Sequence, residues 1–173
     1  IRLVRDTIKL EKQAAKSEIK TLRGSDGRDL RIGVIAIPAF YSDFEAARRG
    51  DPNYRSTTRD VRRLLGELSG RVDGLVLDLR ENGGGSLQEA VDLTGLFIGE
   101  GPVVQVRNAS GDVELEKDSE PGRAYDGPLV VLVDHASASA SEIFAGAIQD
   151  YGRGLVVGDP TFGKGTVQTL VDL

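Results

Sequence analysis

Three short segments of the chain carry the residue types that acyl-transfer chemistry needs. Serine alternates with alanine through residues 137–141 (SASAS), lysine lies between glycines in residues 162–165 (FGKG), and residues 82–85 read NGGG. A serine hydroxyl needs a neighbouring base before it attacks a carbonyl carbon. A lysine amine can be that base once an apolar environment lowers its pKa from about 10.4 toward roughly 7–8. Backbone N–H groups left bare by glycines can then hold an oxyanion.

The serine run follows an apolar segment and begins a stretch whose apolar residues have helical spacing. A serine at the start of that helix would lie near free N–H groups and the positive end of the dipole, which stabilise developing negative charge. Helix capping is the alternative role, because serine is a favoured N-cap residue. One cap needs one serine, so the run leaves a serine for other work.

The other two segments also permit simpler interpretations. The glycines can form a flexible strand-to-helix turn, and Lys164 can be an exposed lysine in a turn. Residues 158–164 match the first seven positions of the phosphate-binding loop G-x-x-x-x-G-K-[ST]. However, Gly165 stands where that loop needs a hydroxyl, and residues 166–171 have the β-branched composition of a strand. A phosphate-binding loop must open a helix, so nucleotide binding is rejected.

Composition excludes several other kinds of site. The 173 residues contain no cysteine and one histidine, which excludes thiolate nucleophiles, disulfides, cysteine–zinc sites and multi-histidine metal sites. A Ser-His-Asp triad could use only His135, which precedes Ser139 by four residues and is the alternative base. The net charge of −5 argues against a nucleic-acid surface. No apolar stretch approaches the roughly 20 residues that span a bilayer.

Apolar periodicity predicts the elements that position these segments. Alternating or continuous apolar runs predict strands, with residues 74–79 buried on both faces, and apolar residues at i, i+3 and i+4 predict helices. The order of strands and helices indicates an α/β fold with a mixed or parallel sheet. The three chemical segments each follow a strand, where function usually lies in such folds. The predicted strands are 1–10, 31–40, 74–79, 103–106, 128–134, 155–157 and 166–173, and the helices are 43–49, 57–68, 86–98 and 138–150.

Taken together, the motifs resemble the tail-specific, or C-terminal processing, serine peptidase family. The segments that carry the resemblance are IRLVRDTIKL, GLVLDLRENGGGSLQEAVDLTGLFI and PLVVLVDHASASASEIFAGAIQDYGRGLVVGDPTFGKGTVQ. The resemblance implies an α/β fold like that of Clp peptidase and crotonase, with a mixed sheet and packed helices in one catalytic core domain over residues 1–173. It also implies that residues 1–10 form a strand after a PDZ domain, with residues 11–30 as a hairpin or linker.

Carried over by position, the resemblance makes Ser139 the nucleophile, Lys164 the base and Gln168 the residue that positions the lysine. It assigns the oxyanion hole to Gly84, Gly85 and the N–H of Ala140. In a regular strand Lys164 and Gln168 would lie about 13 Å apart, so we expect the glycines of this segment to bend the chain. Asp150 matches a polar family position but follows Ser139 by about 16 Å of helix, which predicts a structural role.

The resemblance further implies polypeptide substrates with apolar, unstructured C-termini, cleaved through an acyl-enzyme without a metal or other cofactor. An adaptor protein as partner and a location in the bacterial periplasm belong to the same expectation. We also expect the fragment alone to cleave poorly, because tail recognition would need the PDZ domain. Two alternatives remain open, a non-catalytic binding module and an acyl-CoA enzyme of the crotonase type, although neither needs both Ser139 and Lys164.

Overall fold

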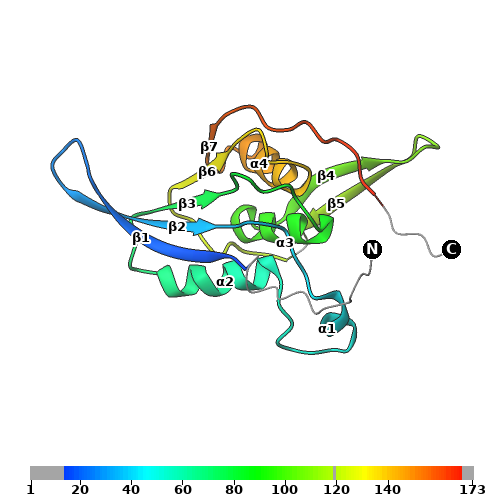
Figure 1. The fold of residues 1–173 in the computed structure, drawn as a ribbon, viewed down its shortest axis with the longest axis horizontal. Helices are drawn as coiled ribbons and strands as arrows, with labels where there is room; N and C mark the ends of the chain where they lie inside the picture. Colours follow the sequence, from blue (N-terminus) through cyan, green and yellow to red (C-terminus); the bar gives the residue numbers. More distant parts are fainter. Residues whose placement is uncertain (1–13, 119, 169–173) are drawn as a thin grey trace, which may run out of the picture.

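The computed structural model describes residues 14–118 and 120–168 and shows a mixed sheet in the order β1-β2-β3-β6-β7 (Figure 1). Strands β1 and β2 pair antiparallel, whereas β2, β3, β6 and β7 are parallel. The predicted α/β fold with a mixed sheet and packed helices is therefore confirmed. The strands are β1 (Lys16–Arg23), β2 (Asp29–Ala36), β3 (Gly74–Asp78), β6 (Leu129–Val133) and β7 (Leu155–Gly158).

Four helices and a separate hairpin complete the described fold. Serine caps begin two of the helices, with Ser56 Oγ accepting the Arg59 N–H and Ser86 Oγ accepting the Glu89 N–H. The hairpin is a second, two-stranded sheet that extends from the body (Figure 1). The helices are α1 (Phe44–Arg48), α2 (Thr57–Leu68), α3 (Leu87–Ile98) and α4 (Ala140–Asp150), and the hairpin strands are β4 (Gly101–Arg107) and β5 (Val113–Asp118).

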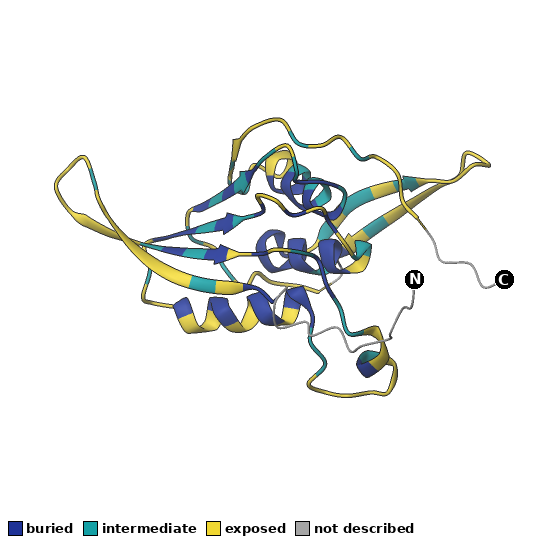
Figure 2. Ribbon diagram, in the orientation of Figure 1, coloured by how far each residue is buried: buried dark blue, intermediate teal, exposed yellow. Residues whose placement is uncertain are grey.

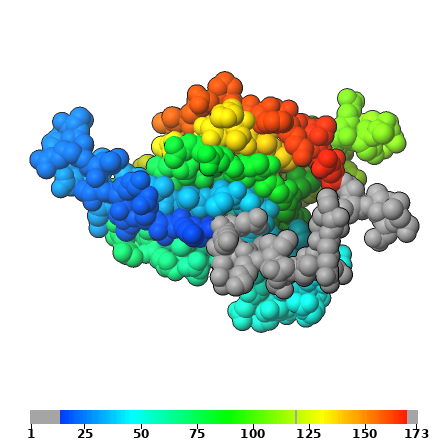
Figure 3. Space-filling model, in the orientation of Figure 1, coloured from blue at the N-terminus to red at the C-terminus, as the bar shows by residue number. Residues whose placement is uncertain are grey.

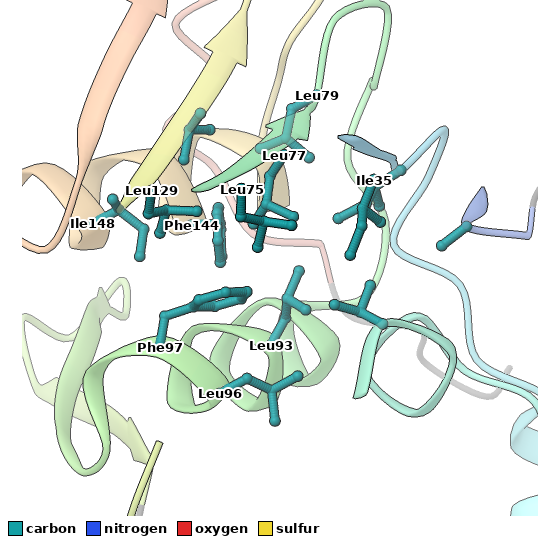
Figure 4. Close-up of a cluster of buried hydrophobic side chains, with 14 of the residues drawn as sticks. Ile35, Leu75, Leu77, Leu79, Leu93, Leu96, Phe97, Leu129, Phe144 and Ile148 are labelled. Carbon is teal, nitrogen blue, oxygen red and sulfur yellow. The ribbon is translucent and has the colours of Figure 1, made fainter. Parts of the chain in front are cut away.

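The main core lies between the sheet and helices α2, α3 and α4 (Figure 2). Phe97 of α3 and Phe144 of α4 meet edge to face, with ring centroids 5.8 Å apart and planes at 80° (Figure 4). Leu77 of β3 and Val131 of β6 are fully buried in the same cluster and are register partners. Edge-to-face pairs and close packing make such a core rigid, so the strand ends are held at defined positions.

One prediction about burial is wrong in part. Along β3, Leu75 and Leu77 are buried, but Val76 and Asp78 are only half-buried. Strand β6 alternates in the same way, with Val130 half-buried. The reason is that the side chains of the described core pack on one face of the sheet, whereas a continuous apolar run predicted burial on both faces.

The sequence also predicts strands at residues 1–10 and 166–173, near the two ends of the chain. Residues 16–36 form an antiparallel hairpin, whereas the strand expected at residues 1–10 lies outside the described residues. Residues 166–168 are not in a strand, contrary to the prediction for residues 166–173, of which 169–173 lie outside the described residues. The backbone N–H groups of Gly163 and Lys164 donate to Glu142 of α4, and these hydrogen bonds hold the residues before 166 away from the sheet. None of the described helices is long and apolar enough to cross a membrane.

Candidate active site

The loops that follow β3, β6 and β7 meet at one edge of the sheet, because the carboxyl ends of parallel strands share an edge. The Phe162 N–H donates to the Ser137 carbonyl at 3.0 Å and joins the last two of these loops. In the space-filling view the orange-to-red C-terminal segment lies against the yellow segment that precedes α4 (Figure 3). The three chemical segments of the sequence are therefore neighbours in space.

A cavity of about 340 Å³ lies where these loops meet. Five of the six predicted site residues line it: Ser139, Lys164, Gln168, Gly85 and Ala140. The rest of the lining consists of Phe44, Ser86, Leu87, Gln88, Ile143, Thr166 and Val167. Gly84 packs behind it. A Cβ at that position would lie 2.9 Å from Ser139 Cβ, so glycine allows the loop to approach the turn at Ser139 closely.

Ser139 occupies a strained turn between β6 and α4. Its φ of 56° and ψ of −113° fall in a region that residues other than glycine rarely adopt. Such strain persists only where the surrounding structure enforces it, and it is common at functional sites. A strand, a sharp turn with a strained serine and then a helix is also the geometry that exposes a nucleophilic Oγ in α/β-hydrolases. Ser139 is half-buried at the cavity wall.

The flanking serines have a different role. Ser137 and Ser141 are both fully buried. Ser137 Oγ donates to the Leu79 carbonyl at 2.8 Å, and Ser141 Oγ donates to the Asn82 carbonyl at 2.9 Å. Both hydroxyls attach the turn at Ser139 to the loop after β3. Only the middle serine of the three lines the cavity, which agrees with the expectation that one serine is left for other work.

Glu142 connects the predicted nucleophile with the predicted base. Its Oε2 accepts hydrogen bonds from the Ser139 N–H at 2.7 Å and from the Lys164 N–H at 3.0 Å. Its Oε1 accepts from the Gly163 N–H at 2.7 Å and from Thr161 Oγ1 at 2.8 Å. Sequence reasoning did not select Glu142. The available signal was its position three residues after Ser139, the S-x-x-E spacing of a capping box.

The charge of Glu142 is stabilised by this arrangement. Partial burial acts to raise the pKa of the carboxyl, but the hydrogen bonds from Gly163, Thr161, Ser139 and Lys164 outweigh it and lower the pKa below its ordinary value of 4.5. A lowered pKa means that the folded protein favours the carboxylate, so this stabilisation is present above about pH 4.5 and is lost as the pH falls through the lowered pKa.

We therefore expect Glu142→Gln to weaken the connection between the two loops. The amide keeps one oxygen acceptor but presents an N–H₂ group to backbone N–H donors, so activity at neutral pH should fall at least tenfold, in line with loss of charge-assisted hydrogen bonds. The free energy of unfolding, measured from pH 3 to 7, should also depend less on pH in the variant. The control is Glu114→Gln, at an exposed position of β5. If the free energy of unfolding depended on pH equally in Glu142→Gln and wild type, the role of the Glu142 carboxylate in joining the two loops would be contradicted.

The three predicted oxyanion donors differ in whether their N–H groups are available to an anion. The Gly84 N–H donates to Asn82 Oδ1 at 2.9 Å, so this predicted donor is already engaged. The N–H groups of Gly85 and Ala140 have no acceptor within residues 14–118 and 120–168. Ala140 begins α4, where the helix dipole adds to the attraction for negative charge.

The other predicted positions are also located by the structure. His135 is exposed in the turn after β6 and does not line the cavity. Asp150 is exposed at the opposite end of α4 from Ser139, which agrees with a role outside the chemistry. Gly163, directly before Lys164, has a φ of 87°, and both Lys164 and Gln168 line the cavity. Across the described ranges no three His, Cys, Asp or Glu side chains are grouped to hold a metal ion.

Comparison with protein families agrees with this geometry, since the model of "Peptidase family S41" matches residues 31–173. The chain belongs to peptidase family S41. It is 47% identical over 169 residues to the tail-specific protease of Haemophilus influenzae, covering 97% of this chain and 22% of that protein. It is 35% identical over 160 residues to carboxyl-terminal-processing peptidase 2, chloroplastic, of Arabidopsis thaliana, covering 91% of this chain and 28% of that one.

A solved S41 relative shows the same architecture. The photosystem II D1 C-terminal processing protease superimposes with a TM-score of 0.74 at 31% identity, over 92% of this chain and 39% of that one. The family resemblance expected from the motifs is thereby confirmed. The chain spans less than a third of the length of the two curated relatives named above.

Proposed function

We propose that the chain is the catalytic part of a serine endopeptidase with Ser139 as nucleophile and Lys164 as base. One observation carries this assignment: a single oxygen of Glu142 accepts the backbone N–H groups of both residues. The contact brings two loops that are distant in sequence to the same wall of the cavity. A non-catalytic module or an acyl-CoA enzyme would not need this pairing.

The mechanism follows from the groups around the cavity. Neutral Lys164 removes the proton from Ser139 Oγ as the oxygen attacks the scissile carbonyl carbon. The N–H groups of Gly85 and Ala140 hold the oxyanion. Gly84 allows the glycine loop (residues 83–85) to lie close to Ser139. The protonated lysine then donates its proton to the leaving amine. A water molecule, deprotonated by Lys164, hydrolyses the acyl-enzyme and restores the serine. Gln168, which lines the same cavity, is the proposed residue for positioning the lysine amine during the reaction.

The proposed substrates are polypeptides with apolar, unstructured C-termini. The cavity contains the apolar side chains Phe44, Leu87, Ile143 and Val167 beside Ser139, which suits an apolar side chain next to the scissile bond. The names of the relatives, tail-specific protease and carboxyl-terminal-processing peptidase, support cleavage near a C-terminus. We also propose the bacterial periplasm as location and an adaptor protein as a partner of the complete enzyme.

Covalent labelling tests the nucleophile directly. Incubation of the full-length protein with a fluorophosphonate, followed by peptide mass spectrometry, should give a single adduct on Ser139 and none in Ser139→Ala. Ser86→Ala is the matched control, because Ser86 lines the same cavity and also precedes a helix; it should be labelled like wild type. An adduct on Ser86 instead of Ser139 would contradict the assignment of the nucleophile. No adduct in wild type would revive the two non-peptidase alternatives.

A further inference from the structure

Asn82 lies between β3 and α3 and is fully buried. Its Nδ2 donates to the Ile37 carbonyl at 2.7 Å, and its Oδ1 accepts the Gly84 N–H at 2.9 Å. Its own backbone carbonyl accepts the Ala138 N–H at 3.0 Å and Ser141 Oγ at 2.9 Å. Asn82 thus connects the end of β2, the glycine loop (residues 83–85) and the turn at Ser139 (residues 137–141).

These contacts determine which way the loop's N–H groups point. With its N–H held by Asn82, Gly84 cannot offer that donor to the cavity. The Gly84 carbonyl accepts the Phe40 N–H at 3.0 Å. The N–H of a trans peptide points opposite to its carbonyl, so the Gly85 N–H points away from Phe40. Gly85 lines the cavity, and its N–H has no acceptor among the residues that the structure describes.

The second donor is aligned through the same residue. The Ala138 N–H and the Ser141 hydroxyl, which flank Ser139 and Ala140, both bind the Asn82 carbonyl. The glycine loop and the start of α4 therefore share one anchor, and a shift of that anchor would move the Gly85 and Ala140 N–H groups relative to each other. An oxyanion site depends on donors held in advance at about 2.7–3.1 Å from one point.

The chemistry of the side chain explains why asparagine occupies this position. A carboxamide offers a donor to the Ile37 carbonyl and an acceptor to the Gly84 N–H at the same time. An ionised aspartate would satisfy the N–H but turn a second oxygen against a buried carbonyl oxygen. An alanine would leave both backbone groups without partners, which is costly in a buried place.

From this geometry we propose that Asn82 is the positioning residue of the oxyanion site, aligning the Gly85 and Ala140 N–H groups on one point. The inference rests on the proposed function, since it assumes that these donors bind an oxyanion formed by attack of Ser139. It adds that the catalytic power of the site depends on a buried side chain that does not line the cavity.

The test compares transition-state binding with ground-state binding in full-length protein. Wild type, Asn82→Ala and the control Asn108→Ala are assayed for kcat and KM on an unstructured polypeptide, and for binding of a peptide boronate and of the same peptide as its amide. Asn108 is a matched control because its Oδ1 also accepts a turn N–H, that of Asp112 at 2.9 Å, but in the β4–β5 hairpin. Thermal unfolding of each variant is recorded.

For Asn82→Ala we expect kcat and boronate affinity to fall together by at least tenfold and by up to roughly 10²–10³-fold, the range for loss of one oxyanion donor. KM and amide-peptide affinity should stay within about twofold, as for Asn108→Ala in every assay. If Asn82→Ala does not fold, Asn82→Asp carries the same comparison. The protonated aspartate again offers a donor and an acceptor, so its kcat relative to wild type should rise as the pH falls from 7 to 5.

Unchanged kcat, or equal losses of boronate and amide-peptide binding, would overturn the positioning role. A kcat ratio for Asn82→Asp that does not change with pH would do the same. Failure of the underlying function has a separate signature, because Ser139→Ala would then retain cleavage, whatever the result for Asn82.

Discussion

Lys164→Ala should lower kcat for an unstructured polypeptide with an apolar C-terminal tail by roughly 10²–10⁴-fold, the contribution of a positioned general base. The fold should stay intact, because Lys164 contacts Glu142 through its backbone N–H, which alanine retains. Within the described residues its side chain has no hydrogen bond or ion pair to lose. The measurement is steady-state hydrolysis by the full-length protein, with thermal unfolding recorded beside it.

Two further variants make this prediction specific. Lys117→Ala removes an exposed lysine from β5 and should leave kcat within about twofold of wild type. Lys164→His should also lose activity, because an imidazole on a shorter side chain does not reproduce the reach of the amine. If Lys164→Ala cleaved the substrate like wild type, the base would lie elsewhere, and His135 would be the next residue to substitute.

Gly85→Ala should disrupt the site as strongly by a different route. The φ of 146° at Gly85 is strongly unfavourable for a residue with a Cβ, and an added Cβ would overlap the Phe40 carbonyl oxygen. Relief of this overlap requires the loop to move away from Phe40 and to break the Ser86 N–H to Phe40 carbonyl hydrogen bond of 2.9 Å. Because the Gly85 N–H moves with the loop, we expect kcat to fall by roughly 10²–10³-fold. The strain alone should cost about 1–3 kcal/mol of unfolding free energy.

Gly83 provides the control within the same loop. A Cβ at Gly83 would meet no atom within 4 Å, and its φ is not in the left-handed region. Gly83→Ala should therefore change the unfolding free energy by less than about 0.5 kcal/mol and keep kcat near wild type. Chemical denaturation measures the unfolding free energy of Gly83→Ala and Gly85→Ala, and steady-state kinetics measures their kcat. Equal behaviour of Gly83→Ala and Gly85→Ala would show that the close approach to Phe40 has no part in the site.

The local elements were predictable from the sequence because their causes are local. Apolar residues at helical spacing place α2 at Thr57–Leu68, and a serine caps the start of each of α2 and α3. The three chemical segments each follow a strand of the parallel part of the sheet, so their convergence follows from topology alone. The family resemblance then selected the middle serine and the lysine, which the structure brings to one cavity.

The features that escaped prediction depend on partners far away in the chain. Residues 166–168 have strand composition, but the preceding Gly163 and Lys164 bind Glu142 instead of a strand edge. The roles of Glu142 and Asn82 come from contacts across 22 and 45 residues, respectively. A sequence pattern reports residues that are close along the chain.

The sequence alone therefore predicted the class of fold and the segments that carry the candidate site, and its family resemblance supplied the proposed nucleophile and base. Only the tertiary structure decided which serine faces the cavity and which N–H groups remain available. The hydroxyls of Ser137 and Ser141 donate hydrogen bonds to the loop after β3 and are not available for catalysis. The Gly84 N–H is likewise occupied by its hydrogen bond to Asn82. A polar group is free for chemistry only when no neighbour satisfies it, and packing brings those neighbours together.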